Sequence, residues 1–357
     1  MRVVVLPSDM TACGFYRMQL PAGAVQQIRP DWKIELYRPG DIQLAGDLAG
    51  LRAVKGLPDP RGIDLLIVQR VGTRMTFQLV EWASRNGIAT IMDSDDAMWA
   101  ISKDNTAWQG WNTEACHWSW MDRTAEVVDL VTVTTPALAK RYGRKHGRAE
   151  VLPNCIPGEV ENVVSERDKY PDTLTIGWAG FTGTHPHDLQ VVGDAVKRVA
   201  SEYHVKVRVV GDAAGASVAW GTDVEQVDPR PKGMPYYHAL TSIDIALVPL
   251  DHTPFNNAKS YLKALEFSSV GVPVIASPTP ANRSLAATVP IHLAVTSSDW
   301  YRYLVYLIED DAFRQDVRGE AYRAVQKHHT YEANAAVWAE TWERAVARQA
   351  KIKVSRG

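Results

Sequence analysis

The chain has 357 residues, a net charge of −2 and 46% hydrophobic residues. Because one hydrophobic core rarely supports so long a chain, we expect two domains. The small net charge excludes a global basic field that would attract nucleic acid, although it leaves room for a local basic groove. The three widely spaced cysteines show no metal-binding pattern and indicate a reducing compartment. No signal peptide and no apolar run of ~18 residues is found, so a cytoplasmic protein is expected.

The N-terminal half alternates apolar runs with amphipathic stretches, which is typical of an α/β domain with a parallel sheet. We assign this domain to residues 1–158. Strands are predicted at 2–7, 32–37, 64–68, 89–92, 127–133 and 150–152, and helices at 17–28, 76–86 and 137–146.

A polar, proline-bounded stretch, 159–172, is predicted to be a linker, and a second α/β domain covers 173–330. The remaining residues, 331–357, form an amphipathic C-terminal helix that we expect to pack back on the N-terminal domain. In the second domain, strands are predicted at 174–178, 206–210, 224–227, 243–249, 272–276 and 291–294, and helices at 188–202, 235–240, 257–269, 298–309 and 312–328.

The stretch 247–277 has the pattern strand, loop, helix, glycine, strand, which is typical of a right-handed crossover in a parallel sheet. The predicted helix begins near Asn257, and Lys259 and Ser260 lie in its first turn. Unpaired backbone N–H groups and the positive end of the helix dipole attract anions. This helix start is therefore predicted to hold phosphate.

Polar or glycine-bearing loops follow the strands in both halves, at 9–16, 69–70, 93–96, 180–185 and 250–260. In parallel α/β sheets, ligands bind outside the carboxyl ends of the strands. We therefore expect two Rossmann-like domains that face each other across a ligand-binding cleft.

The C-terminal half resembles the nucleotide-sugar domain of retaining GT-B glycosyltransferases, in particular the large family-four group. The resemblance rests on a Trp-Ala-Gly run at 178–180 with His185 and Asp188 after it, and on the stretch from Pro249 to Ala276. The N-terminal half resembles compact, phage-type members of that group. There the similar motifs are Cys-Gly-Phe-Tyr-Arg at 13–17, Asp-Ser-Asp-Asp at 93–96 with Trp99, Thr-Thr-Pro-Ala-Leu at 134–138 and Pro-Asn at 153–154.

The family has two glutamates with seven residues between them. By this resemblance, Glu266 is the second of the two and binds the ribose hydroxyls of the donor. A carboxylate accepts two hydroxyl hydrogens well. The first glutamate is absent, because its position is Ala258. The contact to the transferred sugar is therefore expected to differ from that of relatives. The remaining residues expected to bind the donor are Gly14, Gly180, Pro249, Asn257 and Ser260.

The resemblance also implies a nucleotide-sugar donor, with a UDP-sugar favoured, and transfer with retention and without a metal. His185 and Lys259 would stabilise the phosphate as it leaves. In the route proposed for the family, the acceptor attacks from the front face and the departing phosphate oxygen takes its proton. No protein nucleophile is then required, and no convincing Ser/His/Asp or Cys/His constellation is found. Cys13 is interpreted as a packing residue.

The acidic loop at 93–96 has two interpretations. Asp93 and Asp95 form a DxD pair, which in GT-A enzymes binds a metal-diphosphate group. Because the other half already offers a metal-free phosphate site, we instead expect Asp93, Asp95 and Asp96 to position acceptor or sugar hydroxyls. Asp95 or Asp96 is also a candidate base, and an N-capping role is the structural alternative.

The acceptor is suggested by two local features. Five tryptophans, at 99, 108, 111, 118 and 120, lie close together in sequence and are suited either to stack on sugars or bases or to pack a helical insertion. A basic run at 141–148 contains Arg144 and Lys145, which either contact DNA phosphates or neutralise a helix end. The residues predicted to contact the acceptor are Tyr16, Arg17, Trp99, Arg144 and Lys145.

Since phage-type relatives glycosylate modified bases or virion proteins, we expect a hydroxymethylated base such as 5-hydroxymethylcytosine in double-stranded viral DNA. The site of action would then be the host cytoplasm. Two alternatives remain open: a glycosyltransferase for a protein, lipid or glycan, and a nucleotide-sugar-binding or epimerase-like protein that transfers nothing.

Overall fold

The computed structural model describes residues 1–47, 50–57, 59–164, 173–228 and 233–356, without the side chains at 46–47, 50–53, 144–146, 162, 164 and 352–356. The chain divides into two compact units. The N-terminal unit contains Met1–Ile101, Ala107–Asn154 and Tyr331–Gly357. The C-terminal unit contains Cys155–Thr330 together with the short segment Ser102–Thr106. The chain therefore passes from one unit to the other several times.

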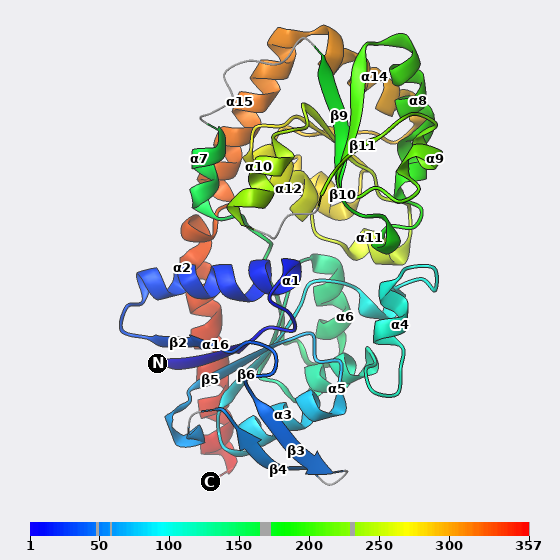
Figure 1. Ribbon diagram of the computed structural model, residues 1–357. Helices are drawn as coiled ribbons and strands as arrows, with labels where there is room; N and C mark the ends of the chain where they lie inside the picture. The colour runs from blue at the N-terminus through cyan, green and yellow to red at the C-terminus, as the bar shows by residue number, and fades with distance from the viewer. Residues whose placement is uncertain (48–49, 58, 165–172, 229–232, 357) are drawn as a thin grey trace. The chain divides into compact units, whose positions relative to one another are not determined.

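The N-terminal unit is built on a parallel six-stranded sheet with the strand order β2-β1-β5-β6-β7-β8 (Figure 1). All five residues of β5 are buried, as expected for a strand covered on both faces. Most strands follow the predicted apolar runs. The strands are β1 (Arg2–Leu6), β2 (Lys33–Leu36), β5 (Leu65–Gln69), β6 (Ala89–Ser94), β7 (Leu130–Val133) and β8 (Ala149–Val151).

Helices of the N-terminal unit connect these strands and pack against the sheet. Thr73 and Thr135 cap α3 and α6 with their side-chain oxygens, as their positions before amphipathic runs indicate. An antiparallel hairpin, β3 (Gln43–Asp47) with β4 (Gly50–Lys55), was not predicted. The helices are α1 (Ala12–Gly14), a π-helix at Phe15–Gln19, α2 (Leu20–Ile28), α3 (Arg74–Arg85), α4 (Ala107–Trp111), α5 (Ser119–Val127) and α6 (Pro136–His146), with 3-10 turns at Pro60–Gly62 and Met98–Ala100.

The C-terminal helix, α16 (Tyr331–Arg356), belongs to the N-terminal unit and contacts α2 and β6 (Figure 1). The Tyr331 hydroxyl donates to the carbonyl of Tyr16, and the Trp342 ring stacks on Trp32 at 6.5 Å between centroids. These buried aromatic contacts hold the last helix of the chain against the first domain.

The C-terminal unit has a second parallel six-stranded sheet, ordered β11-β10-β9-β12-β13-β14. The order reverses direction between β9 and β12, which makes this junction the topological switch point of the sheet. The strands are β9 (Leu174–Phe181), β10 (Val205–Asp212), β11 (Glu225–Val227), β12 (Ile245–Val248), β13 (Val274–Ala276) and β14 (His292–Leu293).

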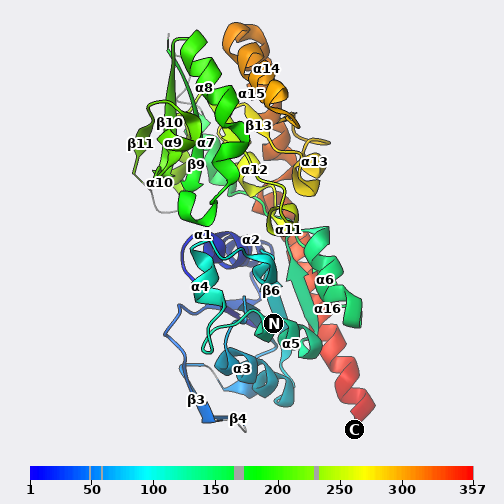
Figure 2. The ribbon, with the colours of Figure 1, turned by 90° about the vertical axis from the view of Figure 1, so that its right-hand side faces the viewer.

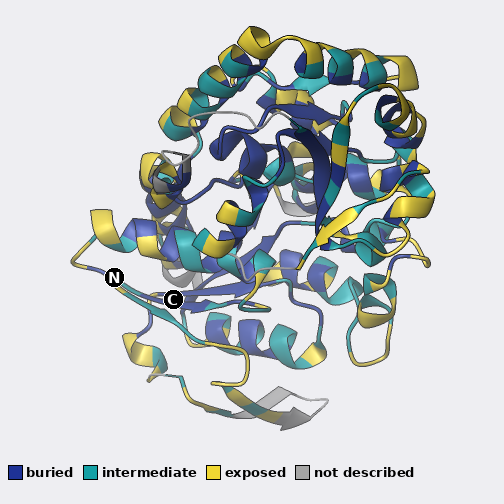
Figure 3. Cartoon of the chain, turned by 45° about the horizontal axis from the view of Figure 1, so that its top comes forward, coloured by how far each residue is buried: buried dark blue, intermediate teal, exposed yellow. Residues whose placement is uncertain are grey.

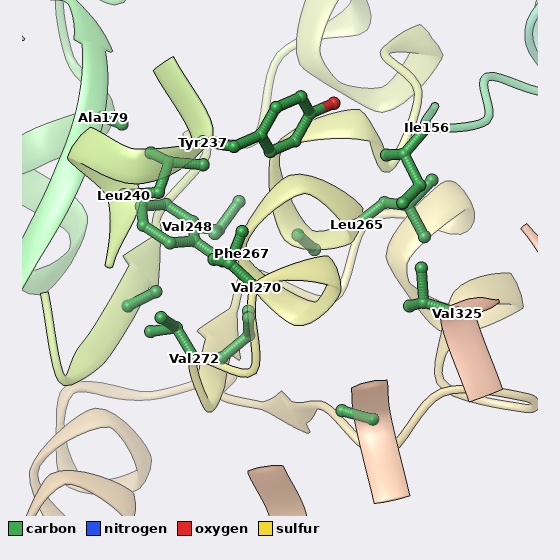
Figure 4. Close-up of a cluster of buried hydrophobic side chains, with 14 of the residues drawn as sticks. Ile156, Ala179, Tyr237, Leu240, Val248, Leu265, Phe267, Val270, Val272 and Val325 are labelled. Atoms are coloured by element: carbon green, nitrogen blue, oxygen red, sulfur yellow. The ribbon is translucent and has the colours of Figure 1, made fainter. Parts of the chain in front are cut away.

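Side chains of this sheet alternate between two hydrophobic clusters. Ala246 and Val248 of β12 belong to one cluster, and Ile245 and Leu247 belong to the other. Figure 4 shows the first cluster, in which Phe267 lies near Val248, while Leu265 of the same helix lies near Ile156. Helices lie on both sides of the sheet in Figures 1 and 2, and its central strands are buried, as their dark blue colour in Figure 3 shows. The sheet is therefore doubly wound.

The first cluster includes residues of α10 (Met234–Leu240), α12 (Leu262–Ser269) and α15 (Asp311–His328), and the second includes residues of α8 (Gly193–Glu202), α9 (Ala216–Trp220) and α14 (Ser297–Glu309). The other helices are α7 (Glu161–Val164), α11 (Pro254–Ala258) and α13 (Pro280–Leu285), with 3-10 turns at Gly158–Val160, Thr182–Thr184 and Asp188–Val192. Among the helices of the described residues, none is long and apolar enough to cross a bilayer.

Two predicted elements differ from the structure. The single helix expected at 257–269 is two helices, α11 and α12, because Lys259 adopts an extended backbone (φ −62°, ψ 151°) between them. The strand expected from residue 127 begins only at Leu130, since Val127 ends α5. The start of the predicted linker forms the short helix α7, and residues 165–172 lie outside the described part of the chain.

Candidate functional site

In the C-terminal unit, the candidate site begins where β9 ends, at its carboxyl edge. Gly180 has no room for a side chain, because a Cβ there would lie 2.6 Å from the Trp178 ring. Its neighbour on β10, Gly211, faces the same limit, since its Cβ would lie 2.1 Å from the carbonyl oxygen of Gly180. These glycines let the strand ends approach closely. Gly180 thus has a packing reason to be glycine, independent of its predicted donor contact.

His185 lies in the loop after β9 and is held on two sides. Its ring meets the buried Trp178 edge-to-face at 5.6 Å, and its Nδ1 lies 2.6 Å from a carboxylate oxygen of Asp188. Burial, followed by the charge of Lys259, lowers the pKa of His185 to about 4. The imidazole is therefore neutral at pH 7. It lies in the electrostatic field of Lys259, the other residue predicted to stabilise a leaving phosphate.

Asp188 connects the loops that follow β9 and β12. It is almost fully buried, and its second oxygen accepts hydrogen bonds from the backbone N–H of Asp251 at 2.8 Å and from Asn256 Nδ2 at 2.7 Å. Burial opposes its ionisation, but the hydrogen bond from His185 contributes to a lowered pKa. Asp188 is thus an ionised carboxylate with three partners, and it fixes both loops at the switch point of the sheet.

Lys259 and Ser260 lie between α11 and α12, so the prediction that they occupy the first turn of a helix is wrong. They precede α12 instead, and Ser260 Oγ accepts from the N–H of Leu262 at 3.4 Å. The Lys259 ammonium lies 4.9 Å from the Phe255 ring centre. No carboxylate among the described residues pairs with Lys259. A half-buried ammonium beside a helix N-terminus remains a suitable arrangement for phosphate.

Pro249 and Asn257 flank the same loop. Pro249 is buried directly after β12, and Asn257 in α11 lies with its side-chain nitrogen 3.2 Å from His252 Nδ1. The side chain of Ser277 accepts a hydrogen bond from the N–H of Leu250. The loop is therefore tied to the neighbouring strand end as well as to Asp188.

Glu266 has no exposed surface and is held by two partners. Its Oε2 accepts hydrogen bonds from the Tyr236 hydroxyl at 2.8 Å and from Lys263 Nζ at 2.9 Å. Burial, together with the carboxylate, raises the pKa of Tyr236 far above its usual range, so the phenol stays protonated and donates. Glu266 is thus a fully buried carboxylate that is oriented by Tyr236 and Lys263.

The segment Ser102–Thr106 adds contacts to the loop after β9 within the C-terminal unit. Thr106 donates its backbone N–H to the carbonyl of Gly183, and Asn105 donates its side-chain amide to the carbonyl of Thr184. The loop before His185 is therefore fastened by a segment that lies 79 positions earlier in the chain at Asn105, which no local sequence pattern indicated.

In the N-terminal unit, Arg70 organises the acidic loop. It is a non-glycine residue with positive φ (47°) at the end of β5, and its guanidinium pairs with both Asp95 and Asp96. Burial disfavours the charged form of Asp95, but Arg70 outweighs it and lowers the Asp95 pKa. An ion-paired carboxylate of lowered pKa is a weak base. Asp96 pairs with the same guanidinium, but its side chain is more exposed than that of Asp95, at 28% against 11%.

Arg17 and Asp93 are core residues, which corrects two predictions. Asp93 has no exposed surface, and the Arg17 guanidinium donates to both of its oxygens, at 3.0 and 2.6 Å. Arg17 also donates to the carbonyl of Leu152 and to Asn154, and it lies over the Trp338 ring. Neither side chain reaches an acceptor from this position, and Asp93 is not the first half of a DxD metal site.

Tyr16 and Gly14 belong to the same packed region. Tyr16 is 1% exposed and packs edge-to-face on Phe15, so the predicted acceptor contact does not fit its position. A Cβ on Gly14 would lie 1.6 Å from the carbonyl oxygen of Asp9. Its N–H donates to the Asp9 side chain, so the loop closes on itself around this glycine. Burial raises the pKa of the Cys13 thiol well above its usual range, in line with packing.

Trp99 also packs within its own unit. Tyr142 meets it edge-to-face at 5.7 Å, and the Arg141 guanidinium lies over its ring at 4.8 Å. Arg141 in turn pairs with Asp122. These contacts favour the packing interpretation of the tryptophan group over stacking on an acceptor. The side chains of Arg144 and Lys145, which were predicted to contact DNA, lie outside the described part of the structure.

Within the described residues, no group of three or more His, Cys, Asp or Glu side chains is placed to hold a metal ion. No role was predicted for Tyr236, Asn256, Asp188 or Lys263. The spacing of Asp188 three residues after His185, and of Lys263 three residues before Glu266, was the available signal. Nothing in the sequence pattern singled out Tyr236.

Comparison with known proteins shows which solved structures share the fold of the chain. Residues 193–340 match a family model described as "Glycosyl transferase-like". No curated protein sequence matches the chain. A sucrose-phosphate synthase from Thermosynechococcus elongatus superposes with a TM-score of 0.65 at 14% identity, covering 97% of this chain and 100% of its own.

Two further solved structures share the architecture. HepE from Anabaena, in complex with UDP-glucose, has a TM-score of 0.63 at 12% identity, with 96% and 99% of the two chains covered. A UDP-GlcNAc 2-epimerase from Neisseria meningitidis, bound to UDP-GlcNAc, has a TM-score of 0.54 at 11% identity, covering 96% and 99%. The predicted fold class, α/β with the two Rossmann-like domains of GT-B glycosyltransferases, is confirmed.

Proposed function

We propose that this chain is a GT-B glycosyltransferase that takes a sugar from a nucleotide-sugar donor, with a UDP-sugar favoured, and transfers it to a hydroxyl group. One observation carries the proposal: the neutral, carboxylate-bound His185 and the half-buried Lys259 adjoin the switch point between β9 and β12. Ligands bind at such a point in doubly wound sheets. The family model that covers 193–340 and the UDP-glucose complex of HepE support the same reading.

The candidate site residues of the C-terminal unit each have a role in this proposal. Lys259 pairs with the donor diphosphate, and the first N–H groups of α12 and Ser260 add hydrogen bonds to it. Glu266 accepts hydrogen bonds from the ribose hydroxyls once a local rearrangement exposes its carboxylate. Gly180, Pro249 and Asn257 shape the loops around the donor.

Transfer proceeds with retention at the anomeric carbon. The bond between that carbon and the phosphate oxygen breaks, and its electron pair leaves with the phosphate. The acceptor oxygen forms the new bond on the same face, and the departing phosphate oxygen takes the acceptor proton. Lys259 and His185 stabilise the negative charge that develops on the diphosphate, which is the largest task of such a site. No metal is needed, because cationic and N–H donors replace it.

For the acceptor we propose a hydroxymethylated base, such as 5-hydroxymethylcytosine, in double-stranded viral DNA, within the host cytoplasm. The support is the sequence: the basic run with Arg144 and Lys145 and the motifs shared with phage-type relatives. Asp96 is the acidic side chain best exposed to assist the acceptor. A protein, lipid or glycan acceptor is the alternative.

The test is a transfer assay with a panel of UDP- and GDP-sugars on duplex DNA with and without hydroxymethylcytosine. Digestion to nucleosides and mass spectrometry should show one hexose added to the modified base alone. Donor consumption that DNA does not stimulate would reject the DNA acceptor and leave the glycosyltransferase assignment in place.

A second candidate function is nucleotide-sugar epimerisation, which is favoured by the shared fold of the Neisseria UDP-GlcNAc 2-epimerase. The two activities differ in their products. An epimerase would convert a UDP-sugar to its epimer without an acceptor. Because the two epimers have the same mass, chromatography would be used to separate the product from the remaining donor.

A further inference from the structure

We propose that Asp188 is a positioning residue of the donor site, which selects the tautomer of His185 and couples it to the loop that leads to Lys259. This inference rests on the proposed function for its ligand, but its structural part concerns the protein alone. The carboxylate lies at the start of the 3-10 turn Asp188–Val192, directly after the loop that carries His185.

The two oxygens of Asp188 have separate partners. One lies 2.6 Å from His185 Nδ1, and the other accepts from the Asp251 N–H and from the Asn256 side chain. A carboxylate can only accept hydrogen bonds, so Nδ1 must carry the proton. A neutral His185 is therefore the Nδ1–H tautomer, in which Nε2 presents a lone pair.

This tautomer has a consequence for an anionic ligand. The described residues supply no hydrogen-bond partner for Nε2, and the His185 side chain retains 19% exposure. An unprotonated Nε2 cannot donate a hydrogen bond to a phosphate oxygen, so it must first gain a proton. The charged groups that act on the ring are Asp188, which favours its protonation, and Lys259 and Lys263, which oppose it. A bound diphosphate would offset both lysines, so its binding should bring a proton to Nε2.

The other Asp188 oxygen gives the residue a second role, because it also holds the loop that leads to Lys259. Asn256 belongs to α11, whose last residue directly precedes Lys259. One buried carboxylate holds both His185 and this helix. The positions of His185 and Lys259, the two proposed partners of the diphosphate, therefore depend on the same group.

The substitution Asp188→Asn separates tautomer selection from loop anchoring. The donors Asp251 N–H and Asn256 Nδ2 both require an oxygen, so the new amide should keep its oxygen toward them and turn its NH₂ toward His185. That NH₂ would donate to Nδ1 and convert His185 to the Nε2–H tautomer. The matched variant Asn256→Ala loosens the loop but leaves the His185–Asp188 pair, so its tautomer should stay unchanged.

The experiment uses the full chain labelled with ¹⁵N-histidine, and His185→Gln identifies the His185 signals in long-range ¹H–¹⁵N spectra. We expect Nδ1–H in the wild type and in Asn256→Ala, and Nε2–H in Asp188→Asn. Calorimetry with UDP-glucose in two buffers should show proton uptake on binding to the wild type and its loss in Asp188→Asn.

An Nε2–H tautomer in the wild type would overturn the inference, as would an unchanged tautomer in Asp188→Asn. If Asp188→Asn does not fold, the wild-type and Asn256→Ala spectra still decide the matter. If the tautomers follow expectation but neither UDP-glucose nor another UDP-sugar binds, the positioning role stands and the proposed donor is rejected.

Discussion

Lys263 and Glu266 lie one turn apart on α12 and form an ion pair of 2.9 Å, although the carboxylate has no exposed surface. A buried charge of this kind is tolerated only when its partners satisfy it, and Tyr236 supplies the second hydrogen bond. The helix thus carries a fixed, ionised acceptor of hydrogen bonds, which is the property that recognition of two ribose hydroxyls requires.

Replacing Glu266 by Gln should weaken UDP binding about 10–100-fold, because a hydrogen bond to a charged group contributes about 1.5–3 kcal/mol. Calorimetric titration with UDP measures this directly. Glu202→Gln, at an exposed position on α8, is the matched control and should bind UDP like the wild type. Equal UDP affinity in the folded Glu266→Gln variant would show that this carboxylate does not bind the ribose.

Lys259→Met should weaken binding of UDP by about tenfold or more and leave uridine binding unchanged, since the ammonium is proposed to contact only the diphosphate. The nucleoside comparison separates lost charge from a distorted loop. Lys197→Met, on the exposed face of α8, controls for the change in net charge. A parallel loss of uridine and UDP affinity would point to a structural role for Lys259 instead.

The pH dependence of donor binding follows from His185. Burial and Lys259 lower its pKa to about 4 in the empty protein, so it is neutral at pH 7. If diphosphate raises that pKa, the complex binds more protons than the free protein, and UDP-glucose affinity must rise as the pH falls from 8 toward 5. The increase is limited to about tenfold per pH unit.

UDP-glucose is the suitable probe, because its diphosphate has no terminal phosphate that titrates in this range. Titrations at several pH values should show the rise for the wild type and a flat profile for His185→Gln. A flat wild-type profile would mean that His185 does not take up a proton when the donor binds.

The Arg17–Asp93 pair gives a prediction about stability. Arg17→Met leaves Asp93 buried without its partner, which should cost about 3–5 kcal/mol and shift the urea midpoint of the N-terminal unit downward. The exposed pair between Arg61 and Asp59 is the comparison, and Arg61→Met should leave the urea midpoint nearly unchanged. Similar urea midpoints for the two variants would contradict the assigned core role of Arg17.

The sequence predicted the strands of both sheets well, because parallel strands that are buried on both faces are continuous apolar runs such as 65–68 and 245–248. It also placed the loop at 250–260 directly after a buried strand, where the structure has it. It missed the break at Lys259, since nothing in the local pattern distinguishes one helix from two short helices whose connection is set by tertiary contacts.

Side-chain partners were the harder part. Arg17 and Asp93 are 76 positions apart, and Arg17 was predicted to contact the acceptor rather than to form a core ion pair. Asp188 was visible only as a residue near His185, because its link to Asn256 exists only once β9 and β12 are adjacent. Pairings of this kind depend on topology, which local periodicity does not encode.

The release of UDP from a panel of UDP-sugars, measured with acceptor for the wild type and Lys259→Met side by side, tests the central claim most directly. The account predicts that the wild type releases UDP from at least one sugar and transfers that sugar. It also predicts that Lys259→Met is slower by about 10²-fold or more, as expected when a preorganised charge at the leaving group is removed. Conversion of a UDP-sugar to its epimer without UDP release, or equal rates for the two proteins, would contradict it.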